Sequence, residues 1–236
     1  EVQKFSPDIV YWRFNKNKFR AVAKELNKLN IRLVFAASHV DDIRPWVWKG
    51  GSAGVRVSLK QRWEHSGFRF VDSMIVLNKD FIKRAPIPEC IYIPNAMSAE
   101  TTSFNWPRPY CAWVANIKSS KRPEAAIRAA EMLRRKNIDL LMVGKIQSLN
   151  YSWIENRHNL PSYCHYLGPQ SPFEVNGILA NSLFHIHTCR PEGFGNIFIQ
   201  AWLQGRPSVS LGFDPCGFIR SEGLGYISDD DEKLFW

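Results

Sequence analysis

The sequence predicts an α/β protein built from two lobes, each with a parallel sheet. Short apolar runs alternate with helix-like segments, and the same rhythm begins again after a polar, proline-rich stretch at 101–109. Strands that alternate with helices are typical of βαβ units and parallel sheets. We therefore expect an N-terminal lobe over residues 1–107 and a C-terminal lobe over residues 108–236. Ligands of such folds bind beyond the carboxyl ends of the strands, here in a cleft between the lobes.

The N-terminal lobe opens with strand and helix signals in alternation. Apolar residues at 19, 22, 23, 26 and 29 repeat with the helical period, so the sequence predicts a helix over 18–30. The glycine-rich segment 49–54 predicts a surface loop. It is not a phosphate-binding P-loop, because it lacks the G-K-[ST] sequence of that motif. Apolar, β-rich runs predict strands at 8–12, 31–38, 73–78 and 90–96.

The C-terminal lobe repeats the pattern more clearly. Pro123 in a first turn supports a helix over 122–137, and Gly205 is a natural end for a helix that begins near Asn196. A third helix is expected over 172–182. Apolar runs predict strands at 110–116, 138–144, 164–168, 183–188 and 207–212.

Composition excludes several classes of protein. With 45% hydrophobic residues, nine tryptophans and fifteen phenylalanines, the chain can bury a core, and no apolar run reaches the length of a membrane span. The five cysteines are scattered and odd in number, which argues against a disulfide framework or zinc site and favours the reducing cytoplasm. His185 and His187 would face one side of a strand, but without an evident third ligand we expect packing rather than a metal site.

The positive charge is concentrated in the first half of the chain. Residues 1–109 carry 18 lysines and arginines against 10 acidic residues, or +8, whereas residues 110–236 carry 13 against 12, or +1. A basic lobe indicates an anionic partner, or else only a solvated basic face. An acidic membrane surface, a phosphate and nucleic acid are the alternatives.

The stretch RPEGFGNIFIQ (190–200) carries the strongest functional signal. Gly193 and Gly195 allow a ligand to approach the backbone, and the helix that follows would favour an anion at its N-terminus. Glu192 would repel a phosphate, so it fits better as an acceptor for the hydroxyls of a sugar attached to one. Asn196, Gln200 and Gln204 lie four apart and would form one polar stripe.

Five segments resemble a known family. PEGFGNIFIQAWLQGRPSV is similar to the E-x7-E segment of retaining GT-B fold glycosyltransferases of family 4 (glycosyl transferases group 1), and WVANIKSSKRPEAAIRAA to their phosphate-binding segment. IDLLMVG, IYIPNA and VDSMIVLN resemble further strands and the interdomain segment of that family. The resemblance implies two Rossmann-like lobes, of which the first is incomplete here and the second lacks its last helices.

The resemblance also implies roles for individual residues. Glu192 would contact the donor sugar and Lys121 the donor diphosphate, so these two are the candidate catalytic residues. Asn116 stands where the family has arginine and Gln200 where it has the second glutamate, while Arg190 can replace part of the missing positive charge. His39 is a candidate on the acceptor side. The remaining expected donor contacts are Gly193, Phe194, Gly195, Asn196 and Ile197.

The function implied is transfer of a sugar from a nucleotide-diphosphate donor, with retention, without a metal or other cofactor, in glycan biosynthesis. The acceptor would be a glycan or a lipid-linked group, reached through peripheral contact with an acidic membrane surface. Two alternatives stay open: a sugar-nucleotide 2-epimerase on the same fold, and a non-catalytic basic module that binds nucleic acid, which the sequence favours less.

Overall fold

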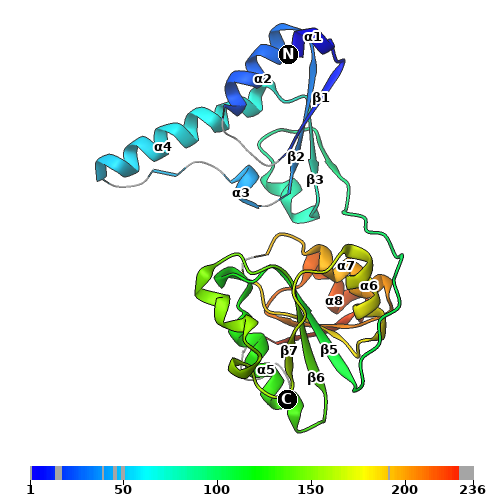
Figure 1. Cartoon of the computed structure of the whole chain (residues 1–236). Coiled ribbons are helices and arrows are strands. Elements are labelled where there is room, and N and C mark those ends of the chain that lie inside the picture. Colours follow the sequence, from blue (N-terminus) through cyan, green and yellow to red (C-terminus); the bar gives the residue numbers. More distant parts are fainter. Residues whose placement is uncertain are drawn as a thin grey trace. The chain divides into compact units, whose positions relative to one another are not determined.

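The protein consists of two units that divide after Asn95 (Figure 1). The computed structural model describes residues 2–13, 18–38, 40–44, 47–48, 51–190 and 192–228. Residues 96–107, expected to close the N-terminal lobe, pack on the C-terminal unit instead. Asn176 Nδ2 donates to the carbonyl oxygens of Ser98 and Glu100 at 2.9 and 2.7 Å. The division therefore comes before this segment rather than after it.

The N-terminal unit is a four-stranded parallel sheet with strand order β1-β2-β3-β4. All four expected strands are present: β1 (Ile9–Arg13), displaced by one residue, and β2 (Arg32–Ala37), β3 (Ser73–Val76) and β4 (Cys90–Tyr92), which are shorter than predicted. The helices are α1 (Val2–Phe5), α2 (Phe19–Lys28), α3 (Val40–Ile43) and α4 (Gly51–His65), with 3₁₀ turns at Ser66–Phe70 and Lys79–Arg84.

Aromatic side chains fill the core of this unit. Phe19 from α2, Phe35 from β2 and Phe68 are buried, and their ring centroids lie 5.0 to 5.3 Å apart. Edge-to-face and tilted ring pairs at this distance add to the free energy gained from burial alone. Leu26 lies on the same buried face of α2 as Phe19 and Ala23 and completes the contact of this helix with the sheet. The helical period read from the sequence therefore marks the face of α2 that is buried.

Helix α4 contradicts the prediction of a surface loop at 49–54, because the helix begins at Gly51 (Figure 1). Its buried side chains are polar. Ser58 Oγ donates to the carbonyl of Gly54, and Glu64 accepts the N–H groups of Lys18 and Arg20 at 3.2 and 3.4 Å. This helix buries serine and glutamate and exposes valine and leucine, so its apolar residues do not form a face turned to the core, and the search for a core-facing period missed it.

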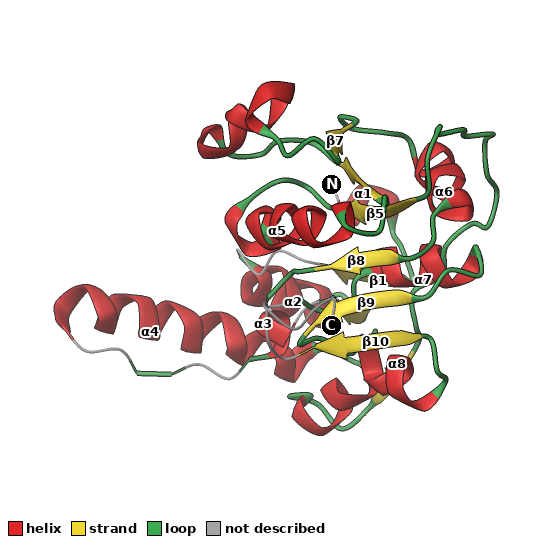
Figure 2. Cartoon of the chain, turned by 90° about the horizontal axis from the view of Figure 1, so that it is seen from below, coloured by secondary structure: helices red, strands yellow, loops and turns green. Residues whose placement is uncertain are grey.

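The C-terminal unit is a six-stranded parallel sheet with the order β10-β9-β8-β5-β6-β7; Figure 2 shows β8, β9 and β10 as neighbouring arrows. The strands are β5 (Tyr110–Val114), β6 (Asp139–Val143), β7 (Cys164–Tyr166), β8 (His185–His187), β9 (Ser208–Leu211) and β10 (Gly225–Ser228). The helices are α5 (Pro123–Arg134), α6 (Pro172–Asn181), α7 (Asn196–Leu203) and α8 (Phe218–Ser221), with 3₁₀ turns at Ser119–Lys121, Leu149–Glu155, Arg157–Asn159 and Pro215–Gly217.

Both faces of this sheet are covered. Along β5, Cys111 and Trp113 point into a cluster with α5, while Tyr110 and Ala112 point into a cluster with α6 and α7. Successive residues of a strand face opposite sides, so a strand covered on both sides is apolar throughout. This explains why the runs at 110–116 and 138–144 are predominantly apolar. The expected helices and strands of this lobe are confirmed, whereas α8 and β10 were not predicted.

Two expectations from composition can be compared with the structure. All five cysteines lie in the described part of the chain, and none forms a disulfide. Across the same residues, no helix is both long enough and apolar enough to span a membrane.

Candidate functional site

The candidate residues come together at one edge of the C-terminal sheet. Strands β5 and β8 are parallel neighbours, with Ala112 opposite His185, so the loops that follow them start at the same edge. Asn116 and Lys121 lie in the loop after β5, and Arg190 and Glu192 in the loop after β8. The Arg190 N–H donates to the Ser120 carbonyl at 3.2 Å and joins the two loops.

Lys121 and Glu192, predicted from different segments, form an ion pair. Lys121 Nζ lies 2.5 Å from Glu192 Oε2, and the two side chains are 23% and 16% exposed. Glu192 Oε1 accepts the N–H of Gly193 at 3.1 Å. The pair places one cation and one carboxylate side by side, partly screened from water. Such a pair can hold an anionic group and a hydroxyl-bearing group at adjacent positions.

Two hydrogen bonds in series hold the backbone of Lys121 in place. Trp113 Nε1 donates to Thr188 Oγ1 at 2.8 Å, and the Thr188 hydroxyl donates to the Lys121 carbonyl at 2.6 Å. The bond to Trp113 anchors Thr188 to the core side chain of β5. The sequence did not predict a role for Trp113 or Thr188, because no motif or spacing indicates that these two residues support Lys121.

His187 and Cys189 also border the pair. His187 Nε2 is 3.6 Å from Glu192 Oε2, and the nitrogen and sulfur atoms of the two side chains lie within 4.8 Å of each other and of the Glu192 carboxylate. His187 was expected to pack without a third partner of metal-ligating type, but the turn after β8 brings Cys189 and Glu192 to it. His185 is fully buried, with Nδ1 3.2 Å from Ser208 Oγ, as expected for a packing residue.

The electrostatics of this cluster favour the charged pair. Burial opposes ionisation of Glu192, but its polar contacts with His187 and Lys121 outweigh burial, so its pKa lies well below the usual range. Burial would lower the pKa of Lys121, but the hydrogen bond and charge of Glu192 raise it. Burial lowers the pKa of His187, whereas burial and the Glu192 charge raise the pKa of Cys189 to about 11. At neutral pH the pair is therefore charged, and Cys189 is a thiol.

The turn after Glu192 needs a glycine at Gly195. This residue caps α7 with φ of 77°, a left-handed conformation, and an added Cβ would lie 2.9 Å from the Phe198 ring. The helix then begins at Asn196, as predicted, and its first N–H groups are directed out of its N-terminus. An anion bound there would be favoured by those N–H groups and by the helix dipole.

Gln200 is engaged by the protein itself. Its Nε2 donates to Asn176 Oδ1 at 2.9 Å, and both residues are buried. One turn later, Gln204 Nε2 donates to the Ala99 carbonyl at 3.0 Å. The polar stripe predicted on α7 is therefore used, at these two positions, to hold α6 and the segment 96–107. Asn176 was missed by sequence reasoning because a lone asparagine in an apolar helix carries no distinctive pattern.

The remaining candidates lie in different surroundings. Arg190 Nε donates to the Leu211 carbonyl at 2.9 Å, so its guanidinium lies at the end of β9. Asn116 is exposed at the end of β5. Phe194 is buried against Phe218, and Ile197 packs beside the α6 and α7 cluster, so both support the loop from inside. His39 lies outside the described residues.

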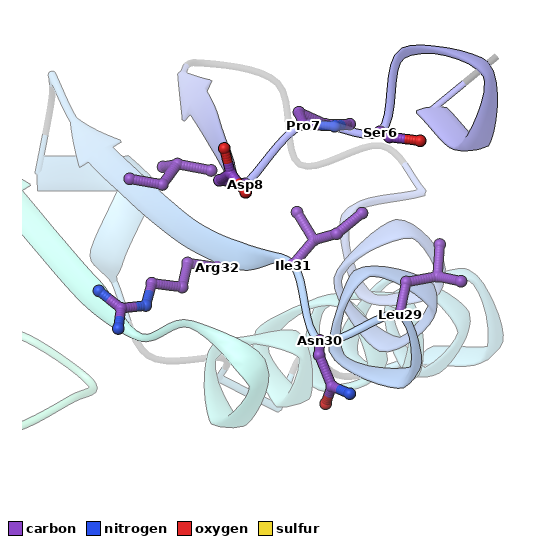
Figure 3. Close-up of a pocket in the computed structure, with 8 residues that line it drawn as sticks. Ser6, Pro7, Asp8, Leu29, Asn30, Ile31 and Arg32 are labelled. Carbon is purple, nitrogen blue, oxygen red and sulfur yellow. The ribbon is translucent and has the colours of Figure 1, made fainter.

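A separate pocket lies in the N-terminal unit (Figure 3). Its lining includes Asp8, at the start of β1, and Asn30, Ile31 and Arg32, at the start of β2. These are the amino ends of the parallel strands, whereas ligands of such sheets bind beyond the carboxyl ends. The pocket is therefore not the candidate site.

Two units that each carry a parallel sheet are the architecture of the two-lobed class of α/β proteins known as the GT-B fold. The particular family follows from the comparison with family models. The chain belongs to the glycosyl transferases group 1, whose model matches residues 108–235. A search of curated proteins by sequence found no match.

Solved structures confirm the predicted fold class. Sucrose-phosphate synthase from Thermosynechococcus elongatus is similar with a TM-score of 0.75 and 15% identity, over 99% of this chain and 64% of that one. HepE from Anabaena in complex with UDP-glucose gives 0.68 and 16%, over 96% of this chain and 66% of that one. The pneumococcal O-GlcNAc transferase GtfA in complex with UDP and GlcNAc gives 0.67 and 17%, over 99% and 49%. The chain thus spans about two thirds or less of these three structures.

Proposed function

We propose that the protein transfers a sugar from a nucleotide-diphosphate donor to an acceptor hydroxyl. The observation that carries this proposal is the Lys121–Glu192 pair beside the N-terminus of α7, at the carboxyl edge of the sheet. Membership of the group 1 family supports it, as do the complexes of HepE with UDP-glucose and of GtfA with UDP and GlcNAc.

In the proposed reaction, Lys121 and the first N–H groups of α7 bind the donor diphosphate. As the bond from the sugar's anomeric carbon to the diphosphate oxygen breaks, its electron pair moves to that oxygen, and these groups stabilise the growing charge. Glu192 accepts a hydrogen bond from a sugar hydroxyl and orients the ring. The acceptor oxygen then bonds to the anomeric carbon on the face that the diphosphate leaves, and its proton passes to the departing diphosphate oxygen. Retention of configuration at that carbon is part of the proposal. Independence of metals is also part of it, because Lys121 supplies a fixed positive charge.

The donor must separate a pair that is already formed. Lys121 Nζ lies only 2.5 Å from Glu192 Oε2, so the two groups are ion-paired before a ligand binds. A ligand must therefore provide a new partner for each charge. A nucleotide-sugar offers both at once, an anionic diphosphate for the ammonium and a hydroxyl for the carboxylate. A nucleoside monophosphate without a sugar offers less. We therefore expect the complete donor to bind better than its fragments.

Binding of UDP and UDP-glucose to two matched variants tests the proposal. Lys121→Met should weaken UDP binding by about 1.5–3 kcal/mol, the contribution of a hydrogen bond to a charged group. Lys136→Met, at an exposed position just after α5, should leave it unchanged. Equal affinities of both variants would place the diphosphate elsewhere. Release of UDP without any acceptor, together with an inverted sugar carbon, would favour the 2-epimerase.

We propose that α4 brings the protein to an acidic lipid surface that carries the acceptor. Val55, Leu59 and Trp63 are spaced by four and are 41%, 50% and 45% exposed. Arg56 and Lys60 each follow one of these apolar side chains, whereas the carboxylate of the helix, Glu64, is buried. An apolar stripe flanked by cations has the chemistry that binds anionic membranes.

Sedimentation with vesicles tests the role of α4. Vesicles with a fifth or so of phosphatidylserine should carry the protein down at low salt and release it at high salt. Leu59→Asp, on the exposed stripe, should abolish this, while Leu149→Asp on the exposed surface of the other unit should not. Equal sedimentation of the two variants would exclude α4 as the contact.

A further inference from the structure

Three side chains of metal-ligating type meet at the end of β8. His187, Cys189 and Glu192 follow one another at intervals of two and three residues, and their nitrogen, sulfur and carboxylate oxygen atoms all lie within 4.8 Å of one another. His187 and Cys189 are only 5% and 3% exposed. The atoms therefore converge on one small, partly buried volume beside Lys121.

His187 provides an independent sign that a ligand fits there. Its Nε2 is buried and has no hydrogen-bond partner, and it is directed toward Glu192 Oε2 at 3.6 Å. On the other side of the ring, Nδ1 lies 3.4 Å from Ser210 Oγ. Without a cation, Nε2–H faces Glu192, and this contact helps to lower the pKa of the carboxyl. With a cation bound, the ring proton lies on Nδ1 and donates to the Ser210 hydroxyl, and Nε2 turns its lone pair to the cation. This is the arrangement of metal-binding histidines, whose second nitrogen is held by a hydrogen bond.

The donor set selects the kind of cation. A thiolate, an imidazole and a carboxylate are the ligands that Zn²⁺ takes in proteins, and three of them leave a fourth position open. Hard cations such as Mg²⁺ prefer oxygen ligands throughout. On binding, the Cys189 thiol would release its proton to solvent and coordinate as the thiolate.

Lys121 opposes such a cation. Its ammonium already lies 2.5 Å from Glu192 Oε2, so a metal ion must take the carboxylate from it and tolerate its charge. We propose that His187, Cys189 and Glu192 bind a thiophilic divalent cation such as Zn²⁺, which separates Glu192 from Lys121 and inhibits the protein. Only the inhibition rests on the proposed function; binding of the cation does not.

Cobalt titration of the whole, reduced protein tests the binding. Co²⁺ is a spectroscopic probe for zinc sites, and a bound thiolate gives a charge-transfer band in the near ultraviolet. One equivalent should give the band and Zn²⁺ should abolish it. Cys189→Ser should lack the band and Cys216→Ser, in the same unit, should keep it. No band in the unaltered protein, or an equal band in Cys189→Ser, would overturn the proposal.

Lys121→Met provides a second readout that a misfolded variant cannot imitate. Removal of the competing ammonium frees Glu192, so this variant should bind Co²⁺ at least about tenfold more tightly than the unaltered protein. Lys136→Met is the matched control and should bind as the unaltered protein does. Weaker or unchanged binding by Lys121→Met would show that the cation does not compete with Lys121.

Inhibition is measured separately. One equivalent of Zn²⁺ should suppress turnover of a UDP-sugar by the unaltered protein, and should suppress turnover by Cys189→Ser much less, each rate taken relative to that of the same protein without Zn²⁺. Equal suppression of both would overturn the inhibitory role while the binding result stands. If UDP-sugars are not turned over at all, the proposed function and the inhibition fail together, and the cobalt titration still decides whether the cation binds.

Discussion

Replacement of Gln200 by glutamate tests how the structure uses the α7 stripe. Asn176 Nδ2 donates to two backbone carbonyls, at Ser98 and Glu100, so its amide cannot turn over without losing both bonds. Asn176 Oδ1 must therefore accept, and Gln200 Nε2 is its donor at 2.9 Å. Gln200→Glu at neutral pH would set a carboxylate oxygen against that acceptor in a buried position.

The cost follows from the bond that is lost and the acceptors left facing each other. Loss of the hydrogen bond costs about 1 kcal/mol, and an unsatisfied buried acceptor about 1–3 kcal/mol more. For a domain of 150–250 residues, a loss of about 2–4 kcal/mol lowers Tm by about 4–16 °C. A protonated glutamic acid can donate to Asn176, so the pKa of the introduced carboxyl should rise above its unfolded value of about 4.3. The loss should therefore be small below that pH and grow as pH rises through the raised pKa.

Thermal melts of the unaltered protein and of Gln200→Glu at neutral pH and near pH 4 measure both effects. Gln204→Glu, whose parent amide donates to the exposed Ala99 carbonyl, is the matched control and should lose less. An equal loss at both pH values, or a Tm within about 1 °C of the unaltered protein at neutral pH, would refute the reasoning.

The same variant separates two roles of Gln200. If this position also contacts the donor ribose, UDP should restore part of the lost stability of Gln200→Glu, because the introduced carboxylate can accept bonds from the ribose hydroxyls. The 2′,3′-dideoxy analogue should then fail to do so. Equal effects of both nucleotides would leave Gln200 with the structural role alone.

Two further predictions concern the loops at the same edge. Gly144→Ala should destabilise the protein by more than about 2 kcal/mol in urea, because φ is 143° and the new Cβ would lie 2.0 Å from the Ala115 carbonyl oxygen. Gly168→Ala, with φ of 74° but open space around it, should cost only about 1 kcal/mol, and equal losses would contradict this. Glu192, with its lowered pKa, should contribute stability above its unfolded pKa of about 4.3 that is lost as pH falls through the folded value. Urea unfolding of Glu192→Gln should therefore depend less on pH in acid, and an unchanged acid dependence would exclude a stabilising Lys121–Glu192 pair.

The sequence by itself determined the order of elements in the C-terminal unit from β5 to β9. The apolar runs of β5 and β6 are buried on both faces, and Pro123 and Gly205 mark helix ends by their own backbone chemistry. The resemblance of its motifs to the glycosyltransferase family also indicated that Lys121 and Glu192 serve one donor site. Both inferences depend on local pattern, which neighbouring residues carry.

Tertiary structure decided the rest. Lys121 and Glu192 are 71 residues apart in the sequence, and only the pairing of β5 with β8 sets their atoms side by side. Helix packing likewise brings Gln200 of α7 to Asn176 of α6. It also buries Glu64, so the sequence pattern of α4 did not predict which side of the helix is buried. Side-chain partners depend on strand order and helix packing, and these follow from burial of the whole core rather than from any short segment.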